Sequence, residues 1–371
     1  MVARVIDDAA MWREDVSQRW PTGIRLNLAE AGGAIGDAVT VVPIILAVGL
    51  TGGFDLGVMF LWFAVFQVIW GLFYGVPISV EPMKALAGLT IAGTLVHADI
   101  VIAGLLMGVL LTGASVTGQL SRIARAVDPA VVRGIQLGVG MILLELAVEI
   151  SLADLPLSVG GIMIAAVLVW TGRRRLAPVA LILIGLPLAL PVSLSFSPPV
   201  PTLVSPAVTA PFAVSGAVLG QAAMTLGNAT LATAVLIGEY FDRSVSADRL
   251  GLSMGLMNLI AVPFGAFPMC HGSGGLAGKY TFGARTVGAN LLLAAGYLAV
   301  AVGALALLQS FPIALVGVLL LIVAAELGLT ALGTTDDRWL AILVGVIGVT
   351  TNLGVALIIG LTTAHLRRIS R

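Results

Sequence analysis

Two short stretches of the sequence combine residues that begin a helix with groups that can bind an anion. The first, residues 75–88, reads GVPISVEPMKALAG, and the second, residues 264–278, reads FGAFPMCHGSGGLAG. Proline suits the first turn of a helix, so we expect helices to begin near Pro82 and shortly after Pro268. The start of a helix carries free N–H donors and about half a positive charge, so two such starts aimed at a shared point would bind an anion.

We expect the anion to lie between these helix starts, held by backbone N–H groups and polar side chains. Lys84 adds a full positive charge, and Gln221 and Asn228 add amide groups from a separate apolar stretch. The predicted substrate-binding residues are Met83, Lys84, Ala85, Gln221, Asn228, His271, Gly272, Ser273, Gly274 and Gly275. The alternative for Lys84 is that its side chain extends to the cytosolic surface and pairs with Glu81.

Carboxylates beside an anion site are candidates for proton coupling, because a dianion that leaves water needs a counter-charge. We expect Asp37 or Glu81 to be the coupling residue, although Asp37 could instead only cap or brace a helix. Glu145 and Glu326 lie deep in apolar stretches, where each could carry a proton or serve as a structural hydrogen-bond partner. Glu30 lies near the end of such a stretch, where we expect it to be solvated.

Metal and nucleotide chemistry are not indicated. A single Cys and three His residues argue against a transition-metal site at Cys270 and His271. The residues up to Lys279 resemble the end of a phosphate loop, but Ser273 stands where the first Gly is required and Tyr280 follows the Lys. We therefore expect no metal, no cofactor and no catalytic residue, and we do not expect an enzyme.

The composition determines what surrounds these residues. Of 371 residues, 59% are hydrophobic and 10% are charged, against about 25% charged residues in soluble domains. The mean hydropathy is +1.09. Most of the chain must therefore face a lipid bilayer. The 19 basic and 19 acidic residues leave no excess charge to attract a nucleic acid.

The apolar stretches predict an all-α polytopic membrane protein with fourteen transmembrane segments. The third and the tenth are too short to cross about 30 Å of hydrocarbon and are expected to be half-helices. The segments are residues 29–50, 56–74, 83–96, 98–118, 131–150, 159–171, 177–195, 212–238, 248–263, 272–282, 285–308, 311–332, 338–350 and 352–366.

Basic residues are expected on the cytosolic side of a membrane. With a cytosolic N-terminus, the fourteen segments place every Lys and Arg other than Lys84 on that side, Lys279 included. This pattern predicts a multi-pass protein of the cell membrane with cytoplasmic N- and C-termini. Residues 1–28 lack the apolar core of a signal peptide, so we expect them to form a cytosolic N-terminal segment.

A weak internal repeat relates the two halves of the chain. Residues 36–38 match residues 227–229, and residues 86–88 match residues 276–278, at nearly equal offsets. Many transporters consist of two inverted halves whose binding site lies between them at the midplane. The repeat therefore favours a duplicated transporter architecture.

The predicted organisation follows from this repeat. Residues 29–195 form the first inverted repeat of seven segments, residues 196–211 an extracytoplasmic Pro-rich linker, and residues 212–371 the second inverted repeat of seven segments. No hydrophilic stretch is long enough for a cytosolic regulatory domain. Glycines four residues apart, such as Gly32 and Gly36, predict close helix packing within the bundle. The sequence does not decide whether the protein forms a homodimer.

These motifs resemble those of the molybdate transporters, a branch of the sulfate-permease superfamily. Residues 82–87, PMKALA, are similar to the first signature of that family, and residues 264–283 are similar to the second. Residues 30–37 and 220–228 also resemble the family pattern. The residues after Gln221 depart from it, because the family tends to carry Pro and bulkier residues there.

The resemblance implies a core domain that moves against a gate domain and imports molybdate, a tetrahedral oxyanion, as a secondary active transporter. Protons are the expected co-transported ion, so the implied partners are the oxyanion, protons and the lipid bilayer. The alternatives are a transporter or channel for sulfate or another anion, a sensor on the same scaffold, and a nucleobase transporter of the same architecture. The sequence does not rank molybdate, tungstate and sulfate.

Overall fold

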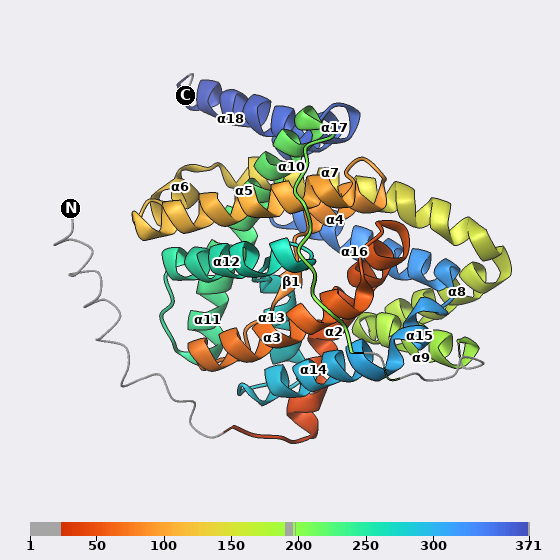
Figure 1. Cartoon of the computed structure of the whole chain (residues 1–371). Helices are drawn as coiled ribbons and strands as arrows, with labels where there is room; N and C mark the ends of the chain where they lie inside the picture. Colours follow the sequence, from red (N-terminus) through yellow and green to blue (C-terminus); the bar gives the residue numbers. More distant parts are fainter. Residues whose placement is uncertain (1–23, 190–195, 197, 370–371) are drawn as a thin grey trace.

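The computed structural model describes residues 24–189, 196 and 198–369 (Figure 1). The cytosolic segment predicted at residues 1–28 lies almost entirely outside the described residues, and so does the end of the seventh predicted segment. Most of the described chain is helical. The longer helices are α2 (Leu28–Thr51), α3 (Leu56–Tyr74), α5 (His97–Val116), α7 (Pro129–Ser151), α8 (Leu155–Trp170), α9 (Ala177–Leu188), α10 (Pro211–Met224), α12 (Ala247–Ala261), α14 (Gly288–Ala299), α16 (Ile313–Gly333), α17 (Arg338–Thr350) and α18 (Leu353–Ile369).

The shorter elements connect or interrupt these helices. They are the strands β1 (Glu81–Pro82) and β2 (Met269–Cys270), the helices α4 (Lys84–Ile91), α6 (Leu120–Ala126), α11 (Thr233–Phe241), α13 (Ser273–Thr281) and α15 (Leu305–Gln309), the 3-10 turns η2 (Leu152–Asp154), η3 (Arg174–Leu176) and η5 (Val262–Phe264), and the π-helical stretches η4 (Thr225–Ala232) and η6 (Val300–Ala304). The sequence did not predict α6 or the two π-helical stretches.

Polar residues at the joints begin several of these helices. Asn27, Asp55 and Asp154 each accept a hydrogen bond from a backbone N–H in the first turn of α2, α3 and α8. Asp128 does the same for α7, whose first residue is Pro129. Such N-caps satisfy donors that the helix itself leaves unpaired. Part of the sparse polar content of the sequence is therefore used to begin helices.

Within the described residues, five helical stretches are long and apolar enough to cross a membrane. They are Leu28–Thr51, Leu56–Tyr74, His97–Val116, Pro129–Trp170 and Ile313–Gly333. Other apolar helices are shorter, such as α17, or are joined through π-helical turns, as α10 is to α11 by η4. The chain has a mostly helical membrane fold, and the count of fourteen segments stays a prediction.

Residues 75–88 and 264–278, which we call the first and second motif stretch, each form a strand followed by a short helix. β1 and β2 pair antiparallel, with Glu81 opposite Cys270 and Pro82 opposite Met269. The helices that follow, α4 and α13, have eight and nine residues. At 1.5 Å per residue they rise about 12–14 Å, less than half of the roughly 30 Å hydrocarbon thickness.

The helices pack into two groups (Figure 1). In group A, which comprises α2–α5 and α10–α14, α12 packs against α5, α13 against α2, and α14 against α2 and α3. In group B, which comprises α7–α9 and α16–α18, α7 packs against α16, α17 and α18, and α8 packs against α9 and α16. The two groups meet where α4 and α10 contact α7, where α10 contacts α18, and where α2 contacts α16.

Close helix packing at glycines, which the four-residue spacing predicted, is confirmed. A Cβ atom at Gly36 would lie 2.8 Å from the carbonyl oxygen of Gly278, which brings α2 against α13. A Cβ atom at Gly134 would lie 2.8 Å from the carbonyl oxygen of Ala341, which brings α7 against α17. Real Cβ atoms do not approach backbone this closely, so these positions require glycine.

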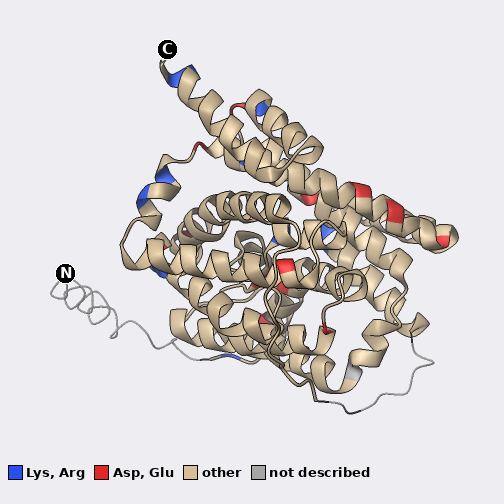
Figure 2. Ribbon diagram, turned by 45° about the horizontal axis from the view of Figure 1, so that its top comes forward, with Lys and Arg blue, Asp and Glu red and all other residues tan. Residues whose placement is uncertain are grey.

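Charged residues occupy a small part of the described ribbon, most of which is drawn in tan (Figure 2). Joints that the charge pattern assigns to one side of the membrane contact each other: the backbone N–H of Ser121 donates to Asp248 at 3.2 Å, and the hydroxyl of Ser121 donates to the same carboxylate. At the opposite end of α5, Asp99 accepts hydrogen bonds from the N–H and the hydroxyl of Thr209 at 2.6 and 2.5 Å. The end of the Pro-rich linker is thereby tied to the start of α5.

Candidate anion-binding site

The paired strands bring the starts of α4 and α13 together. The N–H of Met83 donates to the carbonyl oxygen of Pro268 at 2.9 Å, which extends the contact beyond the β1–β2 pair. α4 begins at Lys84 and α13 at Ser273. The side chain of the N-cap residue Met83 makes no capping hydrogen bond, and the N-cap residue Gly272 has no side chain that could make one. Other N–H donors in the two first turns are therefore left for groups from elsewhere. The N–H of Met83, a predicted anion donor, is used between the two stretches.

Four of the ten predicted binding residues reach the accessible surface. Lys84, Asn228 and Ser273 are half-buried and Gly274 is exposed. A Cβ atom at Gly274 would meet no atom within 4 Å. The buried members are Met83, Ala85, Gln221, His271, Gly272 and Gly275. Of the ten predicted residues, these four are accessible to a ligand, and the other six are enclosed by protein.

Lys84 and Glu81 form an ion pair at the start of α4. Nζ of Lys84 lies 2.5 Å from Oε2 of Glu81, and the two side chains are 13% and 1% exposed. The pairing agrees with the predicted alternative for Lys84, but the largely buried side chain stays near the helix starts. Oε1 of Glu81 accepts the N–H of Gly275 at 2.7 Å. One carboxylate thus links the ammonium group of α4 to the first turn of α13.

Gln221 and Asn228 reach the helix starts from α10 and η4. Oε1 of Gln221 accepts the N–H of Ala85 at 3.0 Å, which satisfies one donor of the first turn of α4. The hydroxyl of Ser273 donates to Oδ1 of Asn228. The NH₂ group on the other branch of that amide can then donate to a ligand. Asn228 lies in the π-helical stretch η4, a type of turn that is frequent at functional sites.

His271 is buried and braces the two motif stretches. Its Nδ1 lies 2.9 Å from the carbonyl oxygen of Ser79. Because that oxygen can only accept, Nδ1 carries a proton. Nε2 lies 2.7 Å from the hydroxyl of Ser253, which also lies 2.9 Å from the carbonyl oxygen of Leu250. Tyr74 donates to the same hydroxyl at 2.8 Å. The structure places His271 beside the site but commits both ring nitrogens to protein groups.

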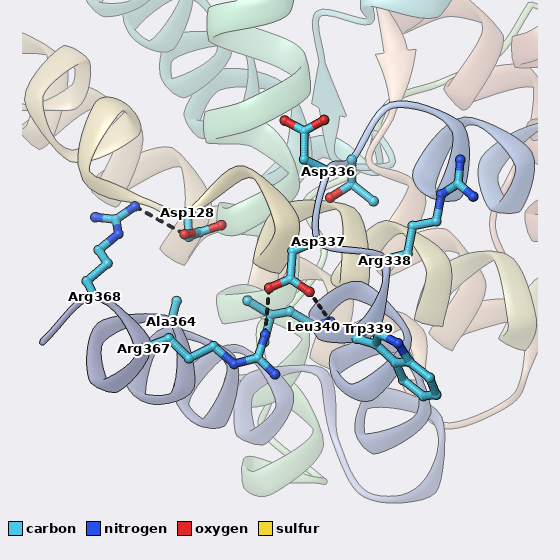
Figure 3. A pocket seen from close by; sticks show the side chains of 10 residues that line it. Asp128, Asp336, Asp337, Arg338, Trp339, Leu340, Ala364, Arg367 and Arg368 are labelled. Atoms are coloured by element: carbon cyan, nitrogen blue, oxygen red, sulfur yellow. Dashed lines mark hydrogen bonds and ion pairs between the residues drawn. The ribbon is translucent and has the colours of Figure 1, made fainter. Parts of the chain in front are cut away.

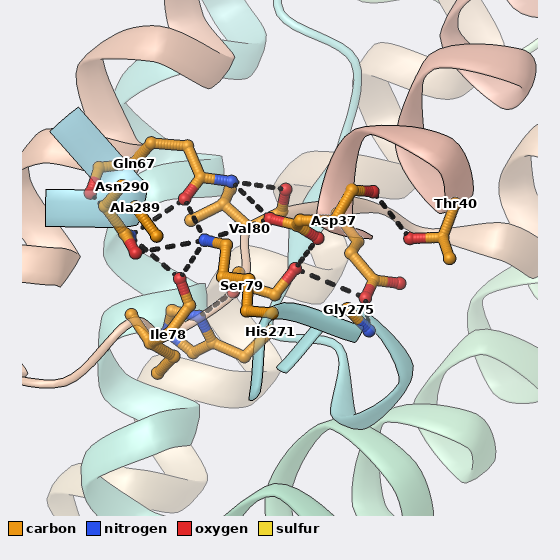
Figure 4. Close-up of polar contacts among 12 residues, drawn as sticks. Asp37, Thr40, Gln67, Ile78, Ser79, Val80, His271, Gly275, Ala289 and Asn290 are labelled. Atoms are coloured by element: carbon orange, nitrogen blue, oxygen red, sulfur yellow. Dashed lines mark hydrogen bonds and ion pairs between the residues drawn. The ribbon is translucent and has the colours of Figure 1, made fainter. Parts of the chain in front are cut away.

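Behind the helix starts, Asp37 belongs to a buried polar cluster (Figure 4). Its Oδ1 accepts from the hydroxyl of Ser79 at 2.5 Å, and its Oδ2 accepts from Nε2 of Gln67 at 3.0 Å. The same Oδ2 lies 3.0 Å from Nζ of Lys279, and both charged side chains are 0% exposed. Asp37 therefore compensates a buried positive charge.

Lys279 is buried inside the protein, although the charge pattern placed it at a joint on the cytosolic side. It lies on the buried face of α13 together with Gly275, one turn earlier. The chain contains two lysines, and Lys279 and Lys84 both lie among the buried elements of the motif stretches. Every other basic residue of the chain, His aside, is an arginine.

Glu30 corrects an expectation from the sequence. It was expected to be solvated, but it is buried, and its carboxylate accepts the backbone N–H groups of Arg285, Thr286 and Ala289 at 3.0, 2.9 and 3.2 Å. It therefore caps the start of α14 from α2. Glu145 and Glu326 are exposed, so neither is a buried structural partner.

A separate polar pocket of about 920 Å³ lies where α17 begins and α18 ends (Figure 3). Across it, Arg367 pairs with Asp337 at 2.6 Å and Arg368 pairs with Asp128 at 3.1 Å. No residue from the start of α4 or α13 lines this pocket. Because its charges largely compensate one another, we do not assign the anion site to it.

The fold is that of a class of membrane anion transporters. The transmembrane domain of the cyanobacterial bicarbonate transporter BicA superimposes with a TM-score of 0.68 at 18% identity, covering 91% of this chain and 98% of that one. The murine anion transporter Slc26a9, in its inward-facing state, gives a TM-score of 0.72 at 13% identity, covering 96% of this chain and 70% of that one. These two likenesses show that the fold is shared.

The chain belongs to the family described as "Molybdate transporter of MFS superfamily", whose model matches residues 29–143 and 213–327. Molybdate transporter 1 of Arabidopsis thaliana is 29% identical, over 91% of this chain and 87% of that protein. Molybdate transporter 1 of Chlamydomonas reinhardtii is 25% identical, over 88% of each chain. These matches confirm the family resemblance that the motifs indicated.

Proposed function

We propose that the protein imports molybdate across the cell membrane by alternating access. The observation that carries this proposal is the donor set at the starts of α4 and α13. The ammonium group of Lys84, the backbone of Ser273 and Gly274, and the amide of Asn228 offer donors from several directions, which suits a tetrahedral dianion. The curated relatives that are molybdate transporters support molybdate as the substrate.

Glu81 is the proposed proton-responsive group. Its carboxylate accepts hydrogen bonds from Lys84 and from the N–H of Gly275. Both donors would otherwise be free to bind the incoming dianion. A proton on Glu81 would remove the negative charge and release both donors, so the proton and the oxyanion would enter together. Asp37, the other predicted coupling residue, is held by Lys279, Ser79 and Gln67, and is the weaker candidate.

In this proposal, group A carries the site and moves against group B. The contacts of α4 and α10 with α7 would then change during transport. The inverted repeats at residues 29–195 and 212–371 and the cytoplasmic termini belong to the same proposal. The family model supports the duplication, because it matches one stretch in each proposed repeat.

The test is uptake of molybdate by proteoliposomes that contain the purified protein, with and without an imposed proton gradient. We expect saturable uptake that an inward proton gradient drives against the molybdate gradient, and competition by tungstate and sulfate but not by uracil. Large uncoupled currents without accumulation would indicate a channel. Competition by uracil would indicate a nucleobase carrier, and the absence of any flux or binding would refute the proposal.

A further inference from the structure

The ammonium group of Lys279 lies in a buried shell of oxygen atoms. Nζ lies 2.9 Å from Oε1 of Gln67, 2.8 Å from the carbonyl oxygen of Ile78, 3.0 Å from Oδ1 of Asn290 and 3.0 Å from Oδ2 of Asp37. These oxygens come from α3, the approach to β1, α14 and α2. An ammonium group has three N–H donors, so four close oxygens resemble the coordination shell of a cation.

The shell is oriented by hydrogen bonds that do not involve Lys279. The NH₂ group of Asn290 donates to the backbone carbonyl of Gln67 at 2.9 Å and to that of Ile78 at 2.8 Å. The NH₂ group of Gln67 donates to Asp37 at 3.0 Å. Both amides are therefore fixed with their oxygens toward the ammonium position. The shell is expected to keep its shape when the ammonium group is removed.

The charge of the shell matches a monovalent ion. Asp37 is its one carboxylate, and the other oxygens belong to neutral amide and peptide groups. Divalent ions such as Ca²⁺ usually take several carboxylates. Carbonyl oxygens can replace the hydration shell of K⁺, and NH₄⁺ is the chemical analogue of the lysine head group.

We propose that the Lys279 position is a monovalent-cation site that the chain fills with its own tethered ammonium group. The native protein then needs neither Na⁺ nor K⁺ to hold α2, α3, α13 and α14 around Asp37. For transport, this rests on the proposed function: molybdate uptake by the native chain does not depend on metal cations. The proposed cation site can be tested by thermal unfolding, without a transport measurement.

The experiment is thermal unfolding of the purified Lys279→Ala variant in KCl, NH₄Cl, NaCl and choline chloride at equal concentration. The shortened side chain leaves room for an ion, so we expect a Tm several degrees higher in K⁺ or NH₄⁺ than in choline. The native protein is expected to show no such difference. Lys279→Met is the matched control, because its methyl end fills the approach to the ammonium position and leaves no room for an ion.

Equal Tm values for Lys279→Ala in all four salts would overturn the proposal, as would an equal salt response of the native protein. If Lys279→Ala yields folded protein only in K⁺ or NH₄⁺, the proposal is supported, and if it yields none in any salt the proposal is refuted. Uptake by the native protein with choline in place of Na⁺ and K⁺ forms a second arm. A failure of molybdate uptake itself would count against the proposed function and leave the thermal result unchanged.

Discussion

The carboxylate of Glu81 lies over the first turn of α13, where it accepts the N–H of Gly275 at 2.7 Å. A Cβ atom at Gly272 would fall on that carboxylate, and one at Gly275 would fall between it and Asp37. The glycines therefore provide the space in which a residue of the first motif stretch caps the helix of the second. The two stretches form one site because each supplies groups to the other.

Glu81→Gln keeps the size of the side chain and removes its charge. We expect molybdate uptake to lose its pH dependence and its response to a proton gradient, because no proton is needed to release Lys84 and the N–H of Gly275. Initial uptake rates across the acidic to neutral range measure this. Glu239→Gln, which changes an exposed carboxylate on α11, is the control. A variant that keeps the native pH profile would exclude Glu81 as the coupling group.

Lys84→Ala removes the ammonium group that lies beside the accessible donors. Charge-assisted hydrogen bonds are worth about 1.5–3 kcal/mol, so we expect molybdate binding to weaken more than tenfold. Titration calorimetry of the purified protein measures the affinity. Lys84→Arg, which retains the charge, is expected to lose less. Equal affinities for the alanine variant and the native protein would show that Lys84 pairs with Glu81 and does not contact the anion.

Two glycine variants test helix packing and ligand access separately: Gly275→Ala tests packing, and Gly274→Ala tests ligand access. The added methyl group at Gly275 would overlap Asp37, Ser79 and Glu81, so we expect a loss of about 1–3 kcal/mol of stability and a lower Tm. Gly274 faces open space, so its variant is expected to keep the native Tm and to bind molybdate more weakly because the methyl group narrows the approach. Equal Tm values for the two variants would contradict the packing described here.

Asp37→Asn leaves the ammonium group of Lys279 buried without its counter-charge. Removing one partner of a buried ion pair costs about 3–5 kcal/mol, so we expect a large fall in Tm. The double variant Asp37→Asn/Lys279→Met removes both charges and is expected to be less destabilised than the sum of the single variants. Additive losses would indicate that the two side chains are not coupled.

Much of the fold could be predicted from local sequence. The helices begin at residues such as Asp55 and Asp128 because an N-cap and a following apolar run are short-range signals. The starts of α4 and α13 were predicted within a few residues from Pro82 and the small residues after Pro268. The π-helical stretch η4 was not predicted, and no local pattern in the sequence marked it.

The site was predicted in part, because Lys279 and Glu30 depend on partners far away in the chain. The burial of Lys279 requires Asp37, more than two hundred residues earlier, and that of Glu30 requires the backbone near Thr286. One signal was available: Lys279 follows Gly275 by four residues, so a helix places both on one face. Gly275 packs against the first motif stretch, so the residue one turn later on the same face is buried with it.

The pairing of β1 with β2 has a thermodynamic consequence. These strands belong to different halves of the chain, yet Glu81 and Cys270 face each other in one ladder, so the starts of α4 and α13 cannot separate without breaking it. If group A moves as one body, the donors keep the same spacing whether the site faces one side of the membrane or the other. The intrinsic dissociation constant for the oxyanion would then be alike on both faces. Accumulation would have to come from the free energy of the coupled ion, because the site itself offers no difference in affinity between the two sides.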